Sequence, residues 1–349
     1  MAAAAGVSRW TFREALRLLE HSGLVESRRG GGGGLFVAAP MLDAVRNGLS
    51  NYLEFVRAEP AEVIATYRAL RELALERALP SIGDDVRPRF QHLLTKVTAP
   101  NWGESFDATN DAWATILHAA GNPALTLLTT TLLRVVLHAA WYSTLDDRSF
   151  HHLMGEMVDA NRSLVQSFVD GDAPRAQGAN NDLLDGARRL LDASFVGGRL
   201  PARPVATERA YRLHPTSRPG KKADVVAREI CTIIHAEGWA VGLNLGTEPE
   251  LMARFGVGRY VMREAIRSLE RMGVVAMGRG GASGLKVISP DPDLIVGASR
   301  KYLQRVGSRR GDIRQVRLAL KAANPTPRGA RDAGYDGQVT RLFESILAP

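Results

Sequence analysis

Apolar residues recur every three or four positions through residues 41–196, in segments that end at proline, glycine or asparagine. This spacing predicts amphipathic helices with clear stops between them. Connections of about two to eight residues favour an antiparallel bundle. The predicted helices are Ala44–Arg57, Ala61–Leu79, Asp84–Thr95, Phe106–Ala120, Pro123–Tyr142, Phe150–Asp170 and Pro174–Leu191.

A second pattern, a helix followed by a glycine-rich hairpin, lies near residues 256–290. Val261, Met262, Ala265, Ile266 and Leu269 form one apolar face of the predicted helix, and arginines four residues apart share another. A glycine ends this helix, and two short β-prone runs flank a glycine-rich tip. Two further helices are predicted upstream, over residues 221–237 and from Thr247 onward. The order predicts a winged helix-turn-helix.

This pattern occurs twice. Residues 6–40 recur without a gap as residues 256–290, and 18 of the 35 aligned pairs are identical. The first five residues align with the end of the second helix of the later copy, so the first copy lacks its first helix. The sequence does not decide whether this copy is functional or whether Met1 is the true start.

The predicted fold class is mainly α, with winged helix-turn-helix modules flanking an all-α antiparallel bundle. Residues 1–40 form a partial winged helix, residues 41–196 the bundle, and residues 197–220 a proline-containing linker. Residues 221–290 form a complete winged helix. Residues 291–349 repeat the start of the bundle weakly and predict two or three helices.

Charge is distributed unevenly along the chain. Residues 201–349 carry 25 Lys and Arg against 14 Asp and Glu, whereas the rest carries 20 against 23. A basic end suggests contact with a polyanion, although an arginine-rich solvated surface would give the same numbers. The single cysteine, Cys231, excludes an intramolecular disulfide. No signal peptide or membrane span is predicted, so we expect a cytoplasmic protein that does not associate with a membrane.

The motif R-x-x-x-REA-[LI]-R-x-LE-x-x-G-[LV]-V, followed by a glycine-rich wing, resembles the DNA-binding domain of the GntR family of bacterial regulators. The bundle resembles the effector-binding domain of the FadR-type branch, called FCD. That likeness lies in the Gly121-Asn122-Pro123 stop and in the segment around Gly171-Asp172. The resemblance implies a transcriptional regulator that binds double-stranded DNA, forms a homodimer and responds to a small carboxylate or acyl effector.

The resemblance also implies which residues contact DNA. The recognition helix would enter the major groove and the wing the adjacent minor groove. These contacts would come from Ser8, Arg9, Trp10 and Arg13 in the first copy, and from Arg259, Tyr260, Arg263, Gly280 and Gly281 in the second. An arginine at a helix start can bind guanine or clamp a phosphate. The alternative is a solvated face in which these arginines pair with neighbouring glutamates.

Candidate effector contacts are polar residues on the bundle helices: Arg134, Asp111, His118, His138 and Asn161. Arg134 lies on an apolar helix and is a candidate anchor for a carboxylate, although an ordinary buried ion pair would explain it equally well. Many FCD domains bind a metal, but Thr109 or Asn110, Trp113 and Asn161 stand where most of the ligands would be. We therefore predict no metal or other cofactor, with a shifted metal site at Asp107, Asp111 and His118 as the alternative.

The sequence leaves two alternatives to a DNA-binding regulator. An enzyme is disfavoured because the sequence contains no phosphate loop with its lysine and no nucleophile elbow. A degenerate tandem fusion, in which effector binding or one DNA-binding head has been lost, is the main alternative. A further hypothesis is that two recognition helices in one chain read two half-sites about 34 Å apart.

Overall fold

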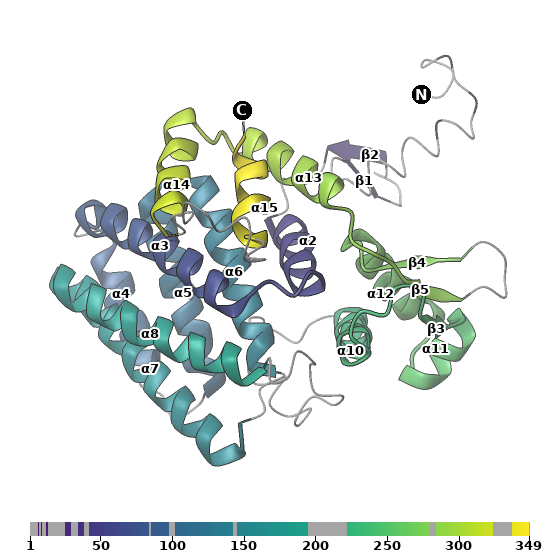
Figure 1. Ribbon diagram of the computed structural model, residues 1–349, viewed down its shortest axis with the longest axis horizontal. Coiled ribbons are helices and arrows are strands. Elements are labelled where there is room, and N and C mark those ends of the chain that lie inside the picture. Colours follow the sequence, from purple (N-terminus) through teal and green to yellow (C-terminus); the bar gives the residue numbers. More distant parts are fainter. Residues whose placement is uncertain are drawn as a thin grey trace, which may run out of the picture.

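The computed structural model describes most of the helical chain and two short hairpins. The described residues are Gly6, Ser8, Phe12, 25–28, 34–37, 42–83, 85–97, 102–141, 145–194, 222–278, 284–323 and 337–348. The molecule is mostly helical with small sheets. A large helical bundle and a smaller head are its main parts (Figure 1).

Seven long helices form the bundle. They are α2 (Leu42–Phe55), α3 (Pro60–Ala78), α4 (Arg87–Val97), α5 (Trp102–Ala120), α6 (Pro123–Trp141), α7 (Asp147–Asp170) and α8 (Ala173–Ser194). A short 3-10 turn, η1 (Leu79–Ser81), follows α3. All seven predicted helices are confirmed, with ends shifted by a few residues. Their apolar faces share one core cluster in which Phe90 stacks on Phe168 with ring centroids 5.0 Å apart.

Local sequence signals explain where several bundle helices begin and end. The Asp146 carboxylate accepts the Ser149 N–H and caps the start of α7. Gly171 ends α7 in the left-handed conformation, with φ 72°. Pro60 occupies the first position of α3, where no N–H is needed. The prediction that one helix starts at Phe106 was wrong by four residues, since α5 begins at Trp102.

The head is formed by three helices and a three-stranded antiparallel sheet. Its elements are α10 (Lys222–Ala236), β3 (Asn244–Gly246), α11 (Glu248–Phe255), α12 (Arg259–Arg271), β4 (Val275–Met277) and β5 (Leu285–Val287). The strand order is β3-β5-β4, so β5 lies in the middle. The sequence did not predict β3, because three residues that include asparagine and glycine carry no strand pattern. The head contains the three helices and the hairpin in the order that the sequence predicted.

Three more helices follow the head and return to the bundle. They are α13 (Pro292–Arg305), α14 (Arg310–Ala323) and α15 (Gln338–Leu347). In Figure 1 they lie along the top of the bundle, above α2 and α3. α13 packs on α2, and α14 packs on α3 and α6. The prediction of two or three helices after the head is therefore confirmed.

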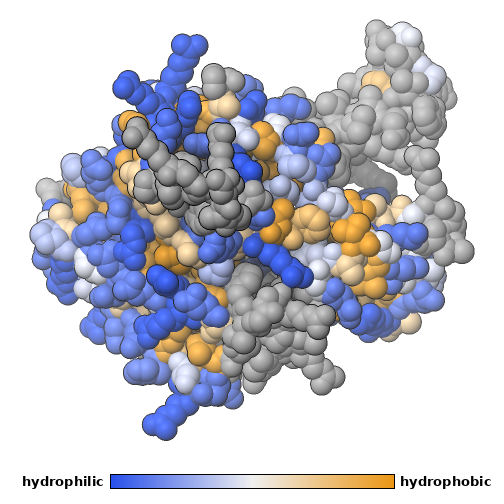
Figure 2. Space-filling model, viewed as in Figure 1, coloured by the Kyte–Doolittle hydropathy of each residue, from blue (hydrophilic) through white to orange (hydrophobic). Residues whose placement is uncertain are grey.

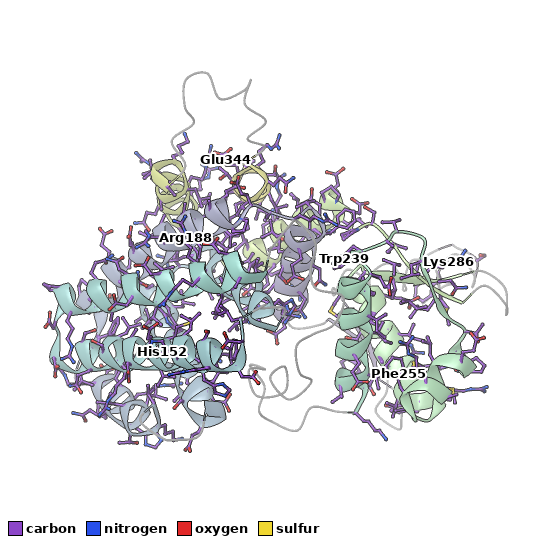
Figure 3. The ribbon with its side chains drawn as sticks, turned by 60° about the horizontal axis from the view of Figure 1, so that its bottom comes forward. His152, Arg188, Trp239, Phe255, Lys286 and Glu344 are labelled. Atoms are coloured by element: carbon purple, nitrogen blue, oxygen red, sulfur yellow. The ribbon has the colours of Figure 1, made fainter. Side chains whose placement is uncertain are left out.

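The head contacts the bundle at the end of α2. The Phe55 ring lies edge-on to Trp239, with centroids 5.9 Å apart. Trp239 follows α10 and lies between that helix and α2 (Figure 3). In the space-filling view, the outer bundle surface is mostly hydrophilic, and apolar side chains gather over the head and its junction with α13 (Figure 2). The ring contact between Phe55 and Trp239 is therefore an apolar part of the junction.

Little of the first repeat copy falls within the described residues. Strands β1 (Val25–Arg28) and β2 (Gly34–Val37) pair antiparallel, with Val25 opposite Val37. This is the hairpin expected of a wing. Most of the helix before it lies outside the described residues, so a partial winged helix over residues 1–40 stays a prediction.

Candidate DNA interface and ligand cavity

The turn between α11 and α12 is built by specific local interactions. The Thr247 side chain and the Glu250 carboxylate cap each other's backbone N–H at the start of α11, a capping box. Gly256 ends α11 in the left-handed conformation, with φ 59°, which a side chain would strain. Gly258 then stands at the N-cap of α12. These residues fix the angle at which α12 leaves the turn.

α12 has one buried face and one exposed face. Met262, Ala265 and Leu269 are fully buried in the core of the head. Tyr260 is 80% exposed, and the exposed side chains of Arg259 and Arg263 lie on the same helix. An exposed tyrosine between two exposed arginines is unusual for a helix whose other side is well packed. This arrangement presents cations and an aromatic ring outward at the start of the helix.

The two arginines share one carboxylate. Arg263 Nε donates to both carboxylate oxygens of Glu248, at 3.0 and 3.2 Å. Arg259 Nε lies 3.4 Å from Glu248 Oε1. Because Glu248 is the first residue of α11, this contact ties the two helices of the helix-turn-helix together. A phosphate or a base edge could replace this one carboxylate at two guanidinium groups.

Several predicted DNA contacts cannot be placed. Arg9, Trp10, Arg13, Gly280 and Gly281 lie outside the described residues, and Ser8 is exposed. Lys286 of β5 is exposed and points outward from the head (Figure 3). The sequence analysis did not single out Lys286 or Glu248, although their positions in the wing and in the turn could have suggested both.

A match to the family described as "Bacterial regulatory proteins, gntR family" spans residues 222–284, the segment that contains this helix-turn-helix. Residues 222–284 are a GntR-family domain. The chain is also similar to two proteins named "HTH-type transcriptional repressor NanR". The one from Citrobacter rodentium is 35% identical over 147 residues, covering 41% of this chain and 54% of the relative. The one from Enterobacter sp. is 31% identical over 141 residues, covering 40% and 52%.

The likeness is partial. The chain spans about half the length of the curated relatives it matches. No solved structure matches it significantly. The names of the family and of both relatives describe regulatory proteins, as the motif in the GntR-family domain predicted. The resemblance to that family is confirmed.

A cavity of about 80 Å³ lies inside the bundle, away from the GntR-family domain. A volume of this size holds several water molecules or a small ligand. Its walls come from α3, α5, α6, α7 and α8. Most of the lining is apolar, and the polar side chains include Tyr67, Arg71, Thr109, Asn110 and Asn161. An apolar pocket with a few polar groups is the usual form of a small-molecule site.

Arg71 dominates the electrostatics of this cavity. It is 4% exposed, and its guanidinium lies over the Trp113 ring at 3.6 Å from the centroid. Its Nε donates to Asn180 Oδ1 at 2.6 Å, and its Nη1 to the Tyr67 hydroxyl at 3.0 Å. Burial lowers the pKa of Arg71, and no carboxylate partner was found for it in the described part of the chain. The cavity therefore holds a cation whose described neighbours are neutral groups.

The free hydrogen-bonding groups around Arg71 are all donors. The buried N–H groups near Arg71 that have no acceptor among the described residues are Arg71 Nη2, Asn110 Nδ2, Trp113 Nε1 and Asn180 Nδ2. Leaving such a group unpaired costs about 1–3 kcal/mol. A ligand that brings acceptor oxygens would satisfy both the donors and the charge. The sequence did not point to Arg71, because nothing in its sequence surroundings distinguishes it from a surface arginine on the same helix, such as Arg68.

The five predicted effector residues do not lie together. Asn161 lines the cavity, but its amide donates to the Met157 carbonyl of its own helix. Asp111 and His118 are exposed on α5 and are not part of the lining. Arg134 and His138 lie on α6 but outside the lining. The structure thus brings only one of the five to the cavity wall.

Arg134 and His138 belong to the junction between bundle and head. His138 Nδ1 lies 2.6 Å from Glu54 Oε1, and both side chains are buried. Burial lowers the pKa of Arg134, and the nearby charge of Glu54 opposes that effect. Burial raises the pKa of Cys231, on α10 of the GntR-family domain, to about 12. The charge of Arg134 opposes the effect of burial on Cys231, so these two side chains of α6 and α10 lie near each other.

No group of three or more His, Cys, Asp or Glu side chains among the described residues converges closely enough to hold a metal ion. No described helix is long and apolar enough to cross a membrane.

Proposed function

We propose that the chain is a DNA-binding transcriptional regulator and that a small anion in the bundle cavity changes its DNA affinity. The observation that carries the first part is the outward pair Arg259 and Arg263 at the start of α12, within the GntR-family match. The relatives named transcriptional repressors support the same function. The second part rests on the buried, uncompensated guanidinium of Arg71.

In the proposed complex, α12 enters the major groove. Arg259 and Arg263 exchange their shared contact with Glu248 for guanine edges or phosphates, and Tyr260 packs against the sugar-phosphate backbone. The β4–β5 wing places Lys286 and the residues at its tip near the neighbouring phosphates. The net charge of +8 favours approach to DNA.

A footprint of the full chain on the DNA around its own gene tests this function. We expect Arg259→Ala/Arg263→Ala to lose the footprint at concentrations at which the wild type protects its site, since each base contact is worth about 1–3 kcal/mol. Arg188→Ala is the matched control, because Arg188 is exposed on α8, far from the head (Figure 3). A footprint that survives the double substitution would overturn the proposed interface.

The proposed effector is a small carboxylate. Its oxygens would accept from Arg71 Nη2 and from the N–H groups of Asn110 and Trp113, and its apolar part would face the leucine and methionine side chains of the cavity. A carboxylate matches the planar donor edge of a guanidinium. A cation would face repulsion from Arg71, and a neutral apolar ligand would leave the donors unpaired.

Helix α6 connects the cavity to the head. Leu133, Val136 and Leu137 line the cavity. On the same helix, His138 contacts Glu54, and Arg134 lies close enough to Glu54 and Cys231 to feel their charges. We propose that filling the cavity shifts α6 and thereby changes the position of α10 against the bundle. A ligand changes DNA affinity only if it binds the two arrangements with different strength.

Thermal denaturation with a panel of small mono- and dicarboxylates tests the cavity. We expect at least one acid to raise the Tm of the wild type, since a ligand at 100 times its Kd adds about 2.7 kcal/mol. The same acid should leave the Tm of Arg71→Met unchanged, and its amide should not act on either protein. An acid that stabilises both proteins equally would place the site elsewhere.

A further inference from the structure

The helices after the head repeat the helices after the first hairpin. α13 spans Pro292–Arg305 and α2 spans Leu42–Phe55, so both bounds differ by 250, the offset of the sequence repeat. α14 begins at Arg310 and α3 at Pro60, again 250 apart. The duplication seen in the winged-helix sequence therefore continues into two bundle helices.

The turns after α2 and α13 share one backbone conformation. Arg57 and Gly307 both adopt the left-handed region, with φ 54° and 73°. A non-glycine residue with positive φ is uncommon, so the match between equivalent positions is informative. The hydrogen bonds around each turn correspond pair by pair: Val56 to Tyr52 and Val306 to Tyr302, then Ala58 to Leu53 and Ser308 to Leu303.

Each duplicated helix packs on its own original. α13 lies on α2, and Ile295 Cγ1 is 3.8 Å from the place that a Cβ on Gly48 would occupy. α14 lies on α3, where Arg77 Nη1 donates to Gln315 Oε1 at 2.6 Å. A helix that packs on a copy of itself resembles the contact at the interface of a two-fold symmetric dimer, where equivalent segments meet. Here both sides of that contact belong to one chain.

The contact between α14 and α3 is part of the hydrophobic core. Val316 and Leu320 of α14 are fully buried in the same apolar cluster as the bundle helices. The equivalent positions of α3, Thr66 and Leu70, are fully buried as well. Leu318, between the two buried residues of α14, is 58% exposed. Without α14, a broad apolar face of α3 and α6 would meet water.

α15 is held at both ends. The buried Glu62 carboxylate of α3 accepts the N–H groups of Val339 and Thr340 at 3.2 and 2.9 Å, which caps the start of α15. Arg300 of α13 donates to the Ser345 carbonyl near its end. The last helix is thereby fastened to one original helix and to one duplicated helix.

We infer that α13, α14 and α15 act as a built-in partner. They occupy the face of α2, α3 and α6 on which the same helices of a second chain would dock, so one chain contains both sides of a dimer-like contact. A tethered partner has an effective concentration in the millimolar range and outcompetes a free copy. The internal copy thus replaces, at this face, the homodimer that the family resemblance predicted.

Sedimentation velocity of the full chain tests the inference by releasing the segment. Val316→Asp/Leu320→Asp buries two carboxylates and should free α14, and the uncovered face should then pair with a second chain. We expect a sedimenting mass twice that of the wild type, while Leu318→Asp on the exposed side should leave the mass unchanged. An unchanged mass with helical content retained, or open-ended aggregates in place of a closed pair, would overturn the inference.

A cysteine cross-link tests the same contact without unfolding it. Gly48→Cys/Ile295→Cys places two thiols across the α2–α13 contact, and each single variant is its control. Oxidation should give a bond within one chain, with the mobility of a monomer on a denaturing gel. A covalent dimer as the main product of the double variant would show that α13 reaches α2 of another chain, which contradicts the inference.

Discussion

Two buried arginines of the bundle, Arg71 and Arg134, have different surroundings. One lies at the ligand cavity and the other at the junction to the head. Arg71 faces the cavity, stacks on Trp113, and bonds to an amide and a phenol. Arg134 lies at the junction, where the Glu54 carboxylate supplies a nearby negative charge. Burial lowers the pKa of both. Among the described residues, one cation thus has a compensating anion and the other does not.

This difference separates a structural charge from a binding one. A paired buried charge contributes to the fold, and removing its partner lowers the free energy of unfolding. An unpaired buried charge is a cost in the free protein and becomes useful only when an anion arrives. Sequence patterns favoured Arg134 as the anchor because it interrupts an apolar helix. The three-dimensional surroundings favour Arg71.

The largest expected effect comes from removing the anion at the junction. Glu54→Ala would leave the surroundings of Arg134 and His138 without their buried carboxylate, and we expect a loss of about 3 kcal/mol in the free energy of unfolding. Urea denaturation measures it. Glu54→Gln keeps an acceptor for His138 and should lose less. Equal losses for both variants would mean that the charge is unimportant there.

At the cavity the expectation is the opposite. Arg71→Met removes a buried charge without a carboxylate partner, so the free energy of unfolding in the absence of ligand should stay the same or rise by up to about 2 kcal/mol. Arg68→Met is the matched control on the same helix, since Arg68 pairs with Asp185 near the surface at 3.2 Å. That control should lose about 0.5 kcal/mol. A large loss for Arg71→Met would make Arg71 structural.

The junction itself can be loosened at its aromatic contact. Phe55→Ala removes the edge-on ring contact with Trp239 and should let the head separate from α2 more often. Cys231 reports this, because burial raises its pKa to about 12 and suppresses thiolate formation at neutral pH. We expect iodoacetamide to modify Cys231 roughly tenfold faster in the variant, a change of about 1.4 kcal/mol. Leu318→Ala, on exposed surface far from the junction, should not alter the rate.

The smallest effect concerns the head alone. Thr247→Ala removes one half of the capping box and should cost about 1 kcal/mol. Hydrogen bonds from the Thr247 backbone N–H and side chain lower the pKa of the Glu250 carboxyl. Its contribution is therefore present at neutral pH and is lost as the pH falls through the lowered pKa. Denaturant unfolding between pH 7 and pH 3 should show this loss in the wild type and not in Glu250→Gln.

The sequence predicted the helices well, because periodic apolar positions and strong stops such as Gly171 mark them directly. It also predicted the helix-turn-helix, because Thr247 and Gly256 are residue types that typically begin and end a short helix, and they do so in α11. Strand β3 was missed because its three residues are defined by their pairing with β5 and not by their own pattern.

The cavity could not be predicted in the same way. Its lining comes from five helices, and Asn110 and Arg71 approach each other only after the bundle packs. A single sequence shows which residues are polar but not which of them lack a partner. That no described carboxylate compensates Arg71 follows from the surroundings of its guanidinium, and so does the assignment of Arg134 to the junction.

The central claim is that an anion beside Arg71 changes the affinity of α12 for DNA. Fluorescence anisotropy of a labelled operator fragment, titrated with the full chain with and without the stabilising carboxylate, measures this coupling. We predict that the carboxylate changes the Kd of the wild type by about 5- to 150-fold and leaves that of Arg71→Met unchanged. An unchanged Kd for the wild type, or an equal change in both proteins, would contradict the claim.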